Sequence, residues 1–142
     1  MTEITLAAAQ VIIGKTLESA RAMNLKPISV VVLDAGGHVK AFAREDGAAP
    51  GRFAIAHGKA YGTVMLGLAG TAQMARAEKQ AYFMAAVNGV YGGQVIPVPG
   101  GIAVTDASDQ IIGAVGVTGD SSENDAEAGL AGIIAAGFDG TI

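Results

Sequence analysis

The sequence predicts an α+β protein in which an antiparallel sheet is covered by helices. Two observations support this. Turn-forming residues divide two β-branched segments into hairpins, and apolar residues recur at helical spacing between them. The order of elements is therefore helix, hairpin, two helices, hairpin, helix. Paired hairpins build antiparallel sheets, whereas parallel sheets need single strands that alternate with helices. We expect four strands from the hairpins and a fifth from residues 92–98.

The first third of the chain contains a helix and a hairpin. Apolar residues at helical spacing predict a helix from Leu6 to about Met23, with Thr5 as its N-cap. Lys26-Pro27 ends it, because the residue before a proline avoids helical geometry. The runs 28–33 and 38–43 then flank an Asp-Ala-Gly-Gly turn, which predicts the first hairpin.

The middle of the chain is helical. A second helix is expected from Arg52 to about Leu66, and Gly67 to Gly70 interrupts it. Thr71 is the expected N-cap of a third helix, which runs to about Val87. Residues 88–101 are rich in glycine and proline, so a loop follows.

The last third repeats the hairpin chemistry. Asp106-Ala107 begins a turn like that of the first hairpin, between a strand that ends near Thr105 and one that starts near Ile111. The final helix is expected from Ser122 to Ala136, and Gly137 ends it.

The composition favours one domain, residues 1–142, in a homo-oligomer. Hydrophobic residues make up 51% of the chain and charged residues only 15%, against about 25% in ordinary soluble proteins. No apolar run reaches the roughly 18 residues of a membrane-spanning helix. A dimer, or a higher assembly of dimers, would cover the surplus apolar surface, and we expect no membrane partner.

Several classes of function are excluded or disfavoured. The absence of cysteine excludes disulfides, thiol catalysis and cysteine-ligated metals, and two histidines are too few for a histidine-rich metal site. A net charge of −4 argues against nucleic acid as a partner. The first residues carry no basic segment of a signal peptide, so a cytoplasmic location is expected.

Four candidate side chains lie in the first half. Arg44 follows an apolar strand, where it either clamps an anion or pairs with a neighbouring acid. His57 and Tyr61 lie one helical turn apart on the border of an apolar stripe. They either move protons or bind iron in a pocket, or they simply cover the edge of the core. Lys59, on the opposite border, either holds a carboxylate or phosphate or is an ordinary surface lysine.

The strongest signal lies in the last third. A proline- and glycine-rich loop ends in Gly100-Gly101, and a glycine-spaced strand ends at Thr118 before an acid-rich helix start. The glycines would let a flat ligand or another chain approach the backbone closely. Glu123 and Asp125 either complement the helix dipole beside a serine cap, or act as a general base or cation site.

Six segments together carry a family resemblance over nearly the whole chain: Val30–Val39, Arg44–Ala48, Lys59–Thr63, Pro99–Gly101, Ile112–Gly119 and Asn124–Asp125. They resemble the GlcG/HbpS-like family, which includes the C-terminal domain of PduO-type cobalamin adenosyltransferases. The resemblance implies a profilin-like five-stranded sheet with helices on both faces, and a homo-oligomer. Some members bind haem, which makes His57, Tyr61 and Thr118 candidate ligands here. This chain departs from the family at Ala126, where a second acid is usual, and at Gly62, where threonine is usual.

Two functions follow from these observations. The first is an oligomeric small-molecule-binding protein that holds haem or another planar ligand, with Gly100, Gly101 and Thr118 contacting it. The alternative is a cofactor-independent lyase, isomerase or hydrolase that acts on a small organic acid. In that enzyme, Arg44 or Lys59 would hold the carboxylate. His57 or Tyr61 would move a proton, and Glu123 or Asp125 would act as the partner base.

Overall fold

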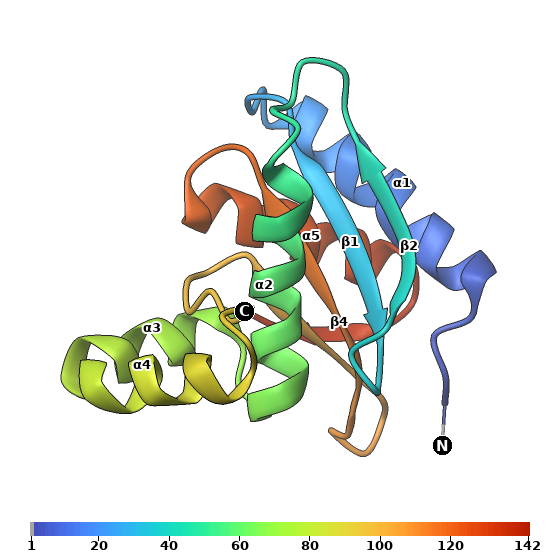
Figure 1. The fold of residues 1–142 in the computed structure, drawn as a ribbon. Coiled ribbons are helices and arrows are strands. Elements are labelled where there is room, and N and C mark those ends of the chain that lie inside the picture. Colours follow the sequence, from blue (N-terminus) through green and yellow to red (C-terminus); the bar gives the residue numbers. More distant parts are fainter. Residues whose placement is uncertain (1) are drawn as a thin grey trace.

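A five-stranded antiparallel sheet forms the centre of the computed structural model, which describes residues 2–142 (Figure 1). The strands lie in the order β2-β1-β4-β3-β5. Their bounds are β1 Ser29–Asp34, β2 Val39–Arg44, β3 Gly101–Thr105, β4 Ile111–Thr118 and β5 Asp139–Thr141. The α+β class and both predicted hairpins are confirmed.

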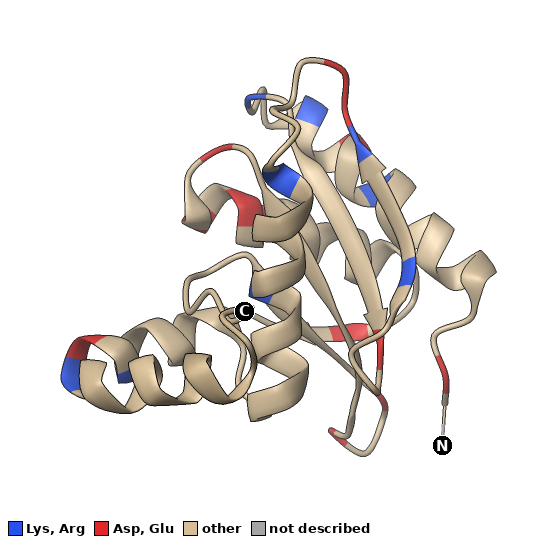
Figure 2. Cartoon of the chain, viewed as in Figure 1, with Lys and Arg blue, Asp and Glu red and all other residues tan. Residues whose placement is uncertain are grey.

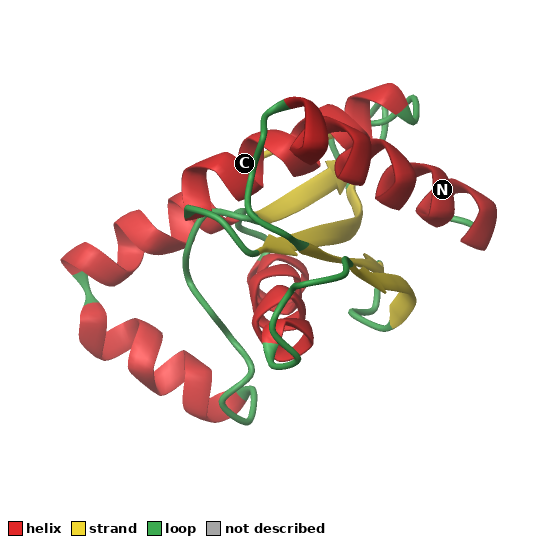
Figure 3. Ribbon diagram, turned by 90° about the horizontal axis from the view of Figure 1, so that it is seen from above, coloured by secondary structure: helices red, strands yellow, loops and turns green. Residues whose placement is uncertain are grey.

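Helices cover both faces of the sheet. Figure 3 shows helices above and below it. The upper pair is α1 (Leu6–Ala22) and α5 (Ser122–Ala135), and the lower helix is α2 (Arg52–Leu66). The helices α3 (Gly70–Lys79) and α4 (Ala81–Val90) form a hairpin that projects from the side of this sandwich.

Alternation along the strands divides the core into two parts. Val30 and Val32 of β1 pack into the larger part, beneath α1 and α5, whereas Val31 and Leu33 pack beneath α2. The second part is thin, because α2 lies almost on the backbone of β4. A Cβ atom at Gly116 would overlap the carbonyl of Ala56. Gly116 therefore permits the close packing of α2 on this strand.

The helix ends follow the local chemistry of the sequence. The Thr5 hydroxyl accepts a hydrogen bond from the Ala8 amide at 3.1 Å, and the Ser121 hydroxyl accepts one from the Asn124 amide at 3.1 Å. Gly137, at φ 92°, takes the left-handed conformation just after α5. All three positions agree with the prediction.

The third predicted helix is wrong in its start and its continuity. It begins at Gly70, whose N-cap Ala69 has no capping side chain, so Thr71 is not the cap. Gly70 sets this start because it packs against the carbonyl of Val98, where a Cβ would overlap. The helix then breaks at Gln80, whose backbone is at φ −137° and ψ 60°. No glycine or proline marks that break.

The fifth strand comes from the C-terminal tail, not from residues 92–98. After Gly137 reverses the chain, the tail pairs with the edge strand β3, with Val104 opposite Gly140. The 92–98 segment stays a loop beside α2, where the Ile96 amide donates to the Gly58 carbonyl at 3.2 Å. Proline at 97 lacks an amide donor, which disfavours a ladder there.

Charge is unevenly distributed over this fold. Figure 2 shows charged residues near the starts of α2 and α5, whereas α4 has none. Only Met84 of α4 is buried, while Tyr82 and Val90 are 72% and 77% exposed. Among the helices of residues 2–142, none has the length and apolar character needed to cross a membrane.

Candidate functional site

Helix α2 carries the candidate residues on two different sides. Successive residues of a helix are about 100° apart, so His57 and Lys59 point about 200° away from each other. Lys59 is 3% exposed and lies beneath the helix, toward the sheet and α5. His57 is half-buried and lies on the outer border. The structure therefore separates residues that one acid–base pocket would bring together.

The outer border of α2 carries a continuous aromatic row, which we define as Phe42, Phe53, His57, Tyr61 and Tyr91. The rings of His57 and Tyr61 are stacked, with centroids 5.3 Å apart and planes at 21°. Phe53 lies 5.8 Å from His57 on the other side and 4.8 Å from Phe42 on β2. Tyr91, at the end of α4, meets Tyr61 edge-on at 6.2 Å. The predicted one-turn spacing of His57 and Tyr61 holds.

A groove of about 500 Å³ runs beside this row, between α2 and the loop that follows α4. Phe53, Ile55 and His57 line its helix side, and Gly93 and Ile96 line its loop side. Its volume falls within the range of about 300–1,000 Å³ that is typical of ligand pockets. Burial lowers the pKa of His57, so the imidazole is neutral at pH 7 and its nitrogens can bind a metal ion.

The inner side of α2 holds a buried ion pair. Lys59 Nζ lies 3.5 Å from Asp125 Oδ2 and donates to the Val117 carbonyl at 3.0 Å. Asp125 is 0% exposed, and its other carboxylate oxygen accepts from the Asp120 amide at 3.0 Å. Desolvation lowers the pKa of Lys59 and raises the pKa of Asp125, and their mutual attraction opposes both shifts. Lys59 is therefore not the ordinary surface lysine that one of our two interpretations predicted.

The glycines of the proline-rich loop pack against this lysine. Gly100 and Gly101 are both buried. A Cβ atom on Gly100 would lie 2.9 Å from Lys59 Nζ, and one on Gly101 would overlap the Lys59 carbonyl. We expected a ligand beside these glycines, but the chain's own lysine fills that space. The backbone approaches closely here because α2 must sit directly on β3.

The acids at the start of α5 have separate tasks. The Asp120 carboxylate accepts from the Lys26 amide at 2.9 Å and from the Asn124 side chain at 2.9 Å. The hydrogen bond from the Lys26 amide is the largest of the causes that lower the pKa of Asp120 to about 2. Glu123 is exposed, and Asp125 is buried. Within residues 2–142, no three His, Asp or Glu side chains converge as a metal site would require.

Arg44 and Thr118 lie near one end of the sheet. Arg44 is exposed at the end of β2 and forms no ion pair within the described residues, because Glu45 pairs with Arg21 at 3.1 Å instead. Thr118, at the end of β4, accepts a hydrogen bond from Arg52 Nη1 at 3.0 Å. We did not single out Arg52 from the sequence. Its signal was its place as the first residue of a helix whose N-cap, Gly51, has no side chain to cap it.

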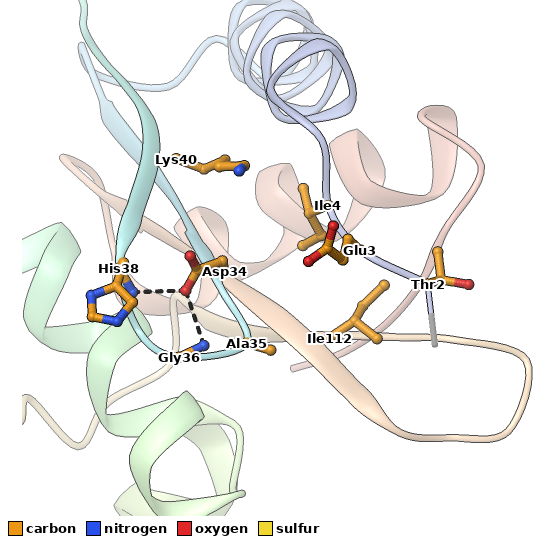
Figure 4. A pocket seen from close by; sticks show the side chains of 9 residues that line it. All are labelled: Thr2, Glu3, Ile4, Asp34, Ala35, Gly36, His38, Lys40 and Ile112. Carbon is orange, nitrogen blue, oxygen red and sulfur yellow. Dashed lines mark hydrogen bonds between the residues drawn. The ribbon is translucent and has the colours of Figure 1, made fainter.

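The other histidine borders a separate cavity of about 210 Å³ at the turn between β1 and β2 (Figure 4). The Asp34 carboxylate there accepts from the Gly36 amide at 2.9 Å and from the His38 amide at 3.0 Å, which fixes the turn. Figure 4 shows the His38 ring on the side away from Lys40. His38 is exposed, so it is a suitable control for His57.

Known proteins share this fold. The C-terminal domain PduOC, solved as a haem complex, has a TM-score of 0.85 and 21% identity, covering 96% of this chain and 97% of that one. ORFY of Klebsiella pneumoniae gives 0.82 and 26%, covering 96% and 92%. A double mutant of HbpS from Streptomyces reticuli gives 0.81 and 24%, covering 94% and 87%. Comparison with curated protein sequences gives no match. The family model described as "Haem degrading protein HbpS-like" matches residues 4–134, so the chain belongs to the HbpS-like family.

Proposed function

We propose that this chain binds haem in the groove beside α2, with His57 as the iron ligand. One observation carries the proposal: a half-buried, neutral imidazole stands in an aromatic row at the edge of a groove of about 500 Å³. Membership of the HbpS-like family and the likeness to PduOC, a haem complex, support it. A neutral imidazole is a common axial ligand of haem iron.

The groove has the chemistry that a porphyrin needs. Phe53, Ile55 and Ile96 offer apolar surface to a flat macrocycle. Tyr61, stacked on His57, fixes the orientation of the imidazole ring. Haem, when bound, would supply a redox-active iron, while the chain supplies the ligand nitrogen and shields one side from water.

Titration with hemin, followed at the Soret band, tests this proposal. We expect one saturable shift, at one haem per subunit or per dimer, in the wild-type protein. The His57→Ala variant should lose it, because the substitution removes the nitrogen and leaves the apolar groove. The His38→Ala variant should keep it, since the exposed His38 lies at the turn between β1 and β2.

The two variants make the result specific. Equal Soret shifts in wild type, His57→Ala and His38→Ala would overturn His57 as the ligand, because hemin also adheres to apolar surfaces without coordination. A Tyr61→Phe variant keeps the ring that packs on His57 and removes the hydroxyl. It should bind hemin like wild type if the imidazole alone is the ligand.

We further propose that a second copy of this chain covers the exposed face of α4. This helix has no charged residue, packs on its partner α3, and leaves Tyr82 and Val90 in solvent. A chain with only 15% charged residues offers a matching apolar surface to itself. Because α4 ends at Tyr91 of the aromatic row, the partner would lie beside the haem groove.

Sedimentation velocity or light scattering tests this interface. Val90→Lys places a charge on the exposed face and should shift the protein toward monomer. Val11→Lys is the control, because Val11 is 47% exposed on α1, on the other side of the sheet. A monomeric wild-type protein, or the same oligomer in both variants, would contradict the interface.

A further inference from the structure

We infer that the start of α2 forms a binding site for a carboxylate, built from Arg52, Thr118 and Ser29. The site can be tested without haem, because none of these residues lines the groove at His57. The first observation is that Arg52 Nη1 donates to the hydroxyl of Thr118 at 3.0 Å. Thr118 ends β4, and this hydrogen bond joins it to Arg52, the first residue of α2.

Ser29 lies beside Thr118 on the same face of the sheet. The two residues are paired in the β1–β4 ladder, and paired residues of antiparallel strands point to the same side. That side faces α2, since Val31, two residues further along β1, packs beneath α2. Ser29 and Thr118 are therefore neighbours on the sheet face that α2 covers, and Arg52 donates to the second of them.

The Ser29 hydroxyl has no partner. Ser29 is 0% exposed, and its Oγ atom makes no hydrogen bond to any described residue. Buried polar groups nearly always find a partner, so an unpaired hydroxyl beside an arginine suggests that a ligand completes the site. The second observation is thus independent of the helix start.

Arg52 has capacity for an anion. A guanidinium has five N–H donors, and only one of Arg52's has a partner among residues 2–142. It forms no ion pair within the same residues, and it is partly exposed, so a solute can reach it. The first turn of α2 has neither a capping side chain nor an acid, although the Arg52 amide itself donates to the Ala49 carbonyl at 3.1 Å.

The surrounding charges favour a single negative charge. Lys59 lies near Arg52, but Asp125 already pairs with it. Arg44 stands opposite Ser29 in the β1–β2 ladder, so a second cation is within reach of the site. Glu123, whose charge also acts on Lys59, is exposed. A planar carboxylate matches the paired donors of a guanidinium better than a spherical ion does.

Titration with sodium propionate, followed by amide chemical shifts, tests the site, with propanamide as the uncharged control. We expect saturable shifts with propionate and none with propanamide. Arg52→Gln should weaken binding about 10- to 100-fold, because it removes charge-assisted hydrogen bonds. Lys79→Gln, which changes an exposed lysine at the end of α3, should change it by less than about threefold.

Ser29→Ala separates ligand binding from folding. The variant removes the unpaired hydroxyl and keeps the small volume, so without propionate its unfolding midpoint should equal or exceed that of wild type. With propionate it should gain less stability than wild type does. A variant that is stabilised by propionate as much as wild type would overturn the role of Ser29.

The carboxylate can belong to a free short-chain acid or to a haem propionate. Saturable, Arg52-dependent binding of sodium propionate identifies the free acid. If propionate does not bind, but hemin binds more weakly to Arg52→Gln and hemin dimethyl ester does not respond to that variant, the carboxylate is that of haem. If neither ligand responds to Arg52→Gln, the inference is wrong, whatever His57→Ala shows about iron.

Discussion

The two sides of helix α2 differ in almost every physical respect. The inner side holds Lys59 against Asp125 and the backbone of Gly100, with no space left over. The outer side holds His57 between two aromatic rings beside an open groove. Both sides carry a titratable group, yet only the outer group is reachable by a ligand.

The comparison shows that residue type alone does not indicate function. A lysine and an aspartate suggest catalysis in the sequence, but in the structure they satisfy each other and two backbone groups. Burial of both charges is tolerated because the pair also bonds the Val117 carbonyl and the Asp120 amide. The inner pair therefore joins α2 to the start of α5, and the outer border is left for binding.

The largest effect is expected from Lys59→Met, which tests whether the inner side of α2 is structural. The substitution leaves the Asp125 carboxylate buried without its cation, which should lower the free energy of unfolding by about 3–5 kcal/mol. The double variant Lys59→Met/Asp125→Asn should recover part of the loss, because no uncompensated charge is left. Urea denaturation measures both. A single variant that costs less than about 1 kcal/mol would mean that the pair is not structural.

A smaller effect is expected where α2 rests on β4. Gly116→Ala places a methyl group on the Ala56 carbonyl and should cost about 1–3 kcal/mol, since α2 must move away from the sheet. Gly14→Ala is the matched control. Gly14 is exposed in α1 with no atom near its missing Cβ, so alanine should stabilise the protein by about 0.5–1 kcal/mol. Equal effects of the two variants would contradict the tight packing of α2.

Much of the fold could be predicted because local chemistry decided it. Thr5, the two Asp-Ala turns and Gly137 each act within a few residues of their place in the chain. The errors occurred where distant contacts decided. Gly70 starts α3 because of the loop at Val98, and the tail forms β5 because the edge of β3 is free. Neither contact leaves a periodic signal in the sequence.

The site was predictable only in part for the same reason. The helical spacing of His57 and Tyr61 was enough to pair them. The partner of Lys59 comes from 66 residues away, and the bond between Arg52 and Thr118 also spans 66 residues. Arg44 was conspicuous next to a glycine-rich loop, but Arg52 had the better partners. Spacing gives neighbours on one helix, whereas these contacts need the sheet register.

The acid limb of the stability curve should depend on Asp120. Its pKa is lowered from 3.8 to about 2, chiefly by the hydrogen bond from the Lys26 amide. Because the folded pKa lies below the unfolded one, the stabilisation is complete above pH 3.8 and is lost as the pH falls toward 2. Asp120→Asn should therefore flatten the loss of stability in this range, as measured by thermal unfolding. An Asp120→Asn variant that keeps the wild-type slope would contradict this role.

The smallest expected effect is a pH dependence of stability that comes from His57, on the outer side of α2. Burial lowers the pKa of His57 below 6.5, so the unfolded chain binds a proton that the folded chain does not hold. Stability should therefore rise slightly with pH from the folded pKa up to 6.5. His57→Gln should remove this slope, while His38→Gln should keep it.

Hemin binding should follow the same titration, because iron and a proton compete for one imidazole nitrogen. The affinity of wild type for hemin should fall as His57 becomes protonated, and that of Lys59→Met should fall over the same pH range. If the pH range of this loss differed in Lys59→Met, the protonation of His57 would depend on the charge of Lys59, and the two sides of the helix would be coupled. Independence of the two titrations would show that α2 keeps its structural charge pair and its ligand side apart.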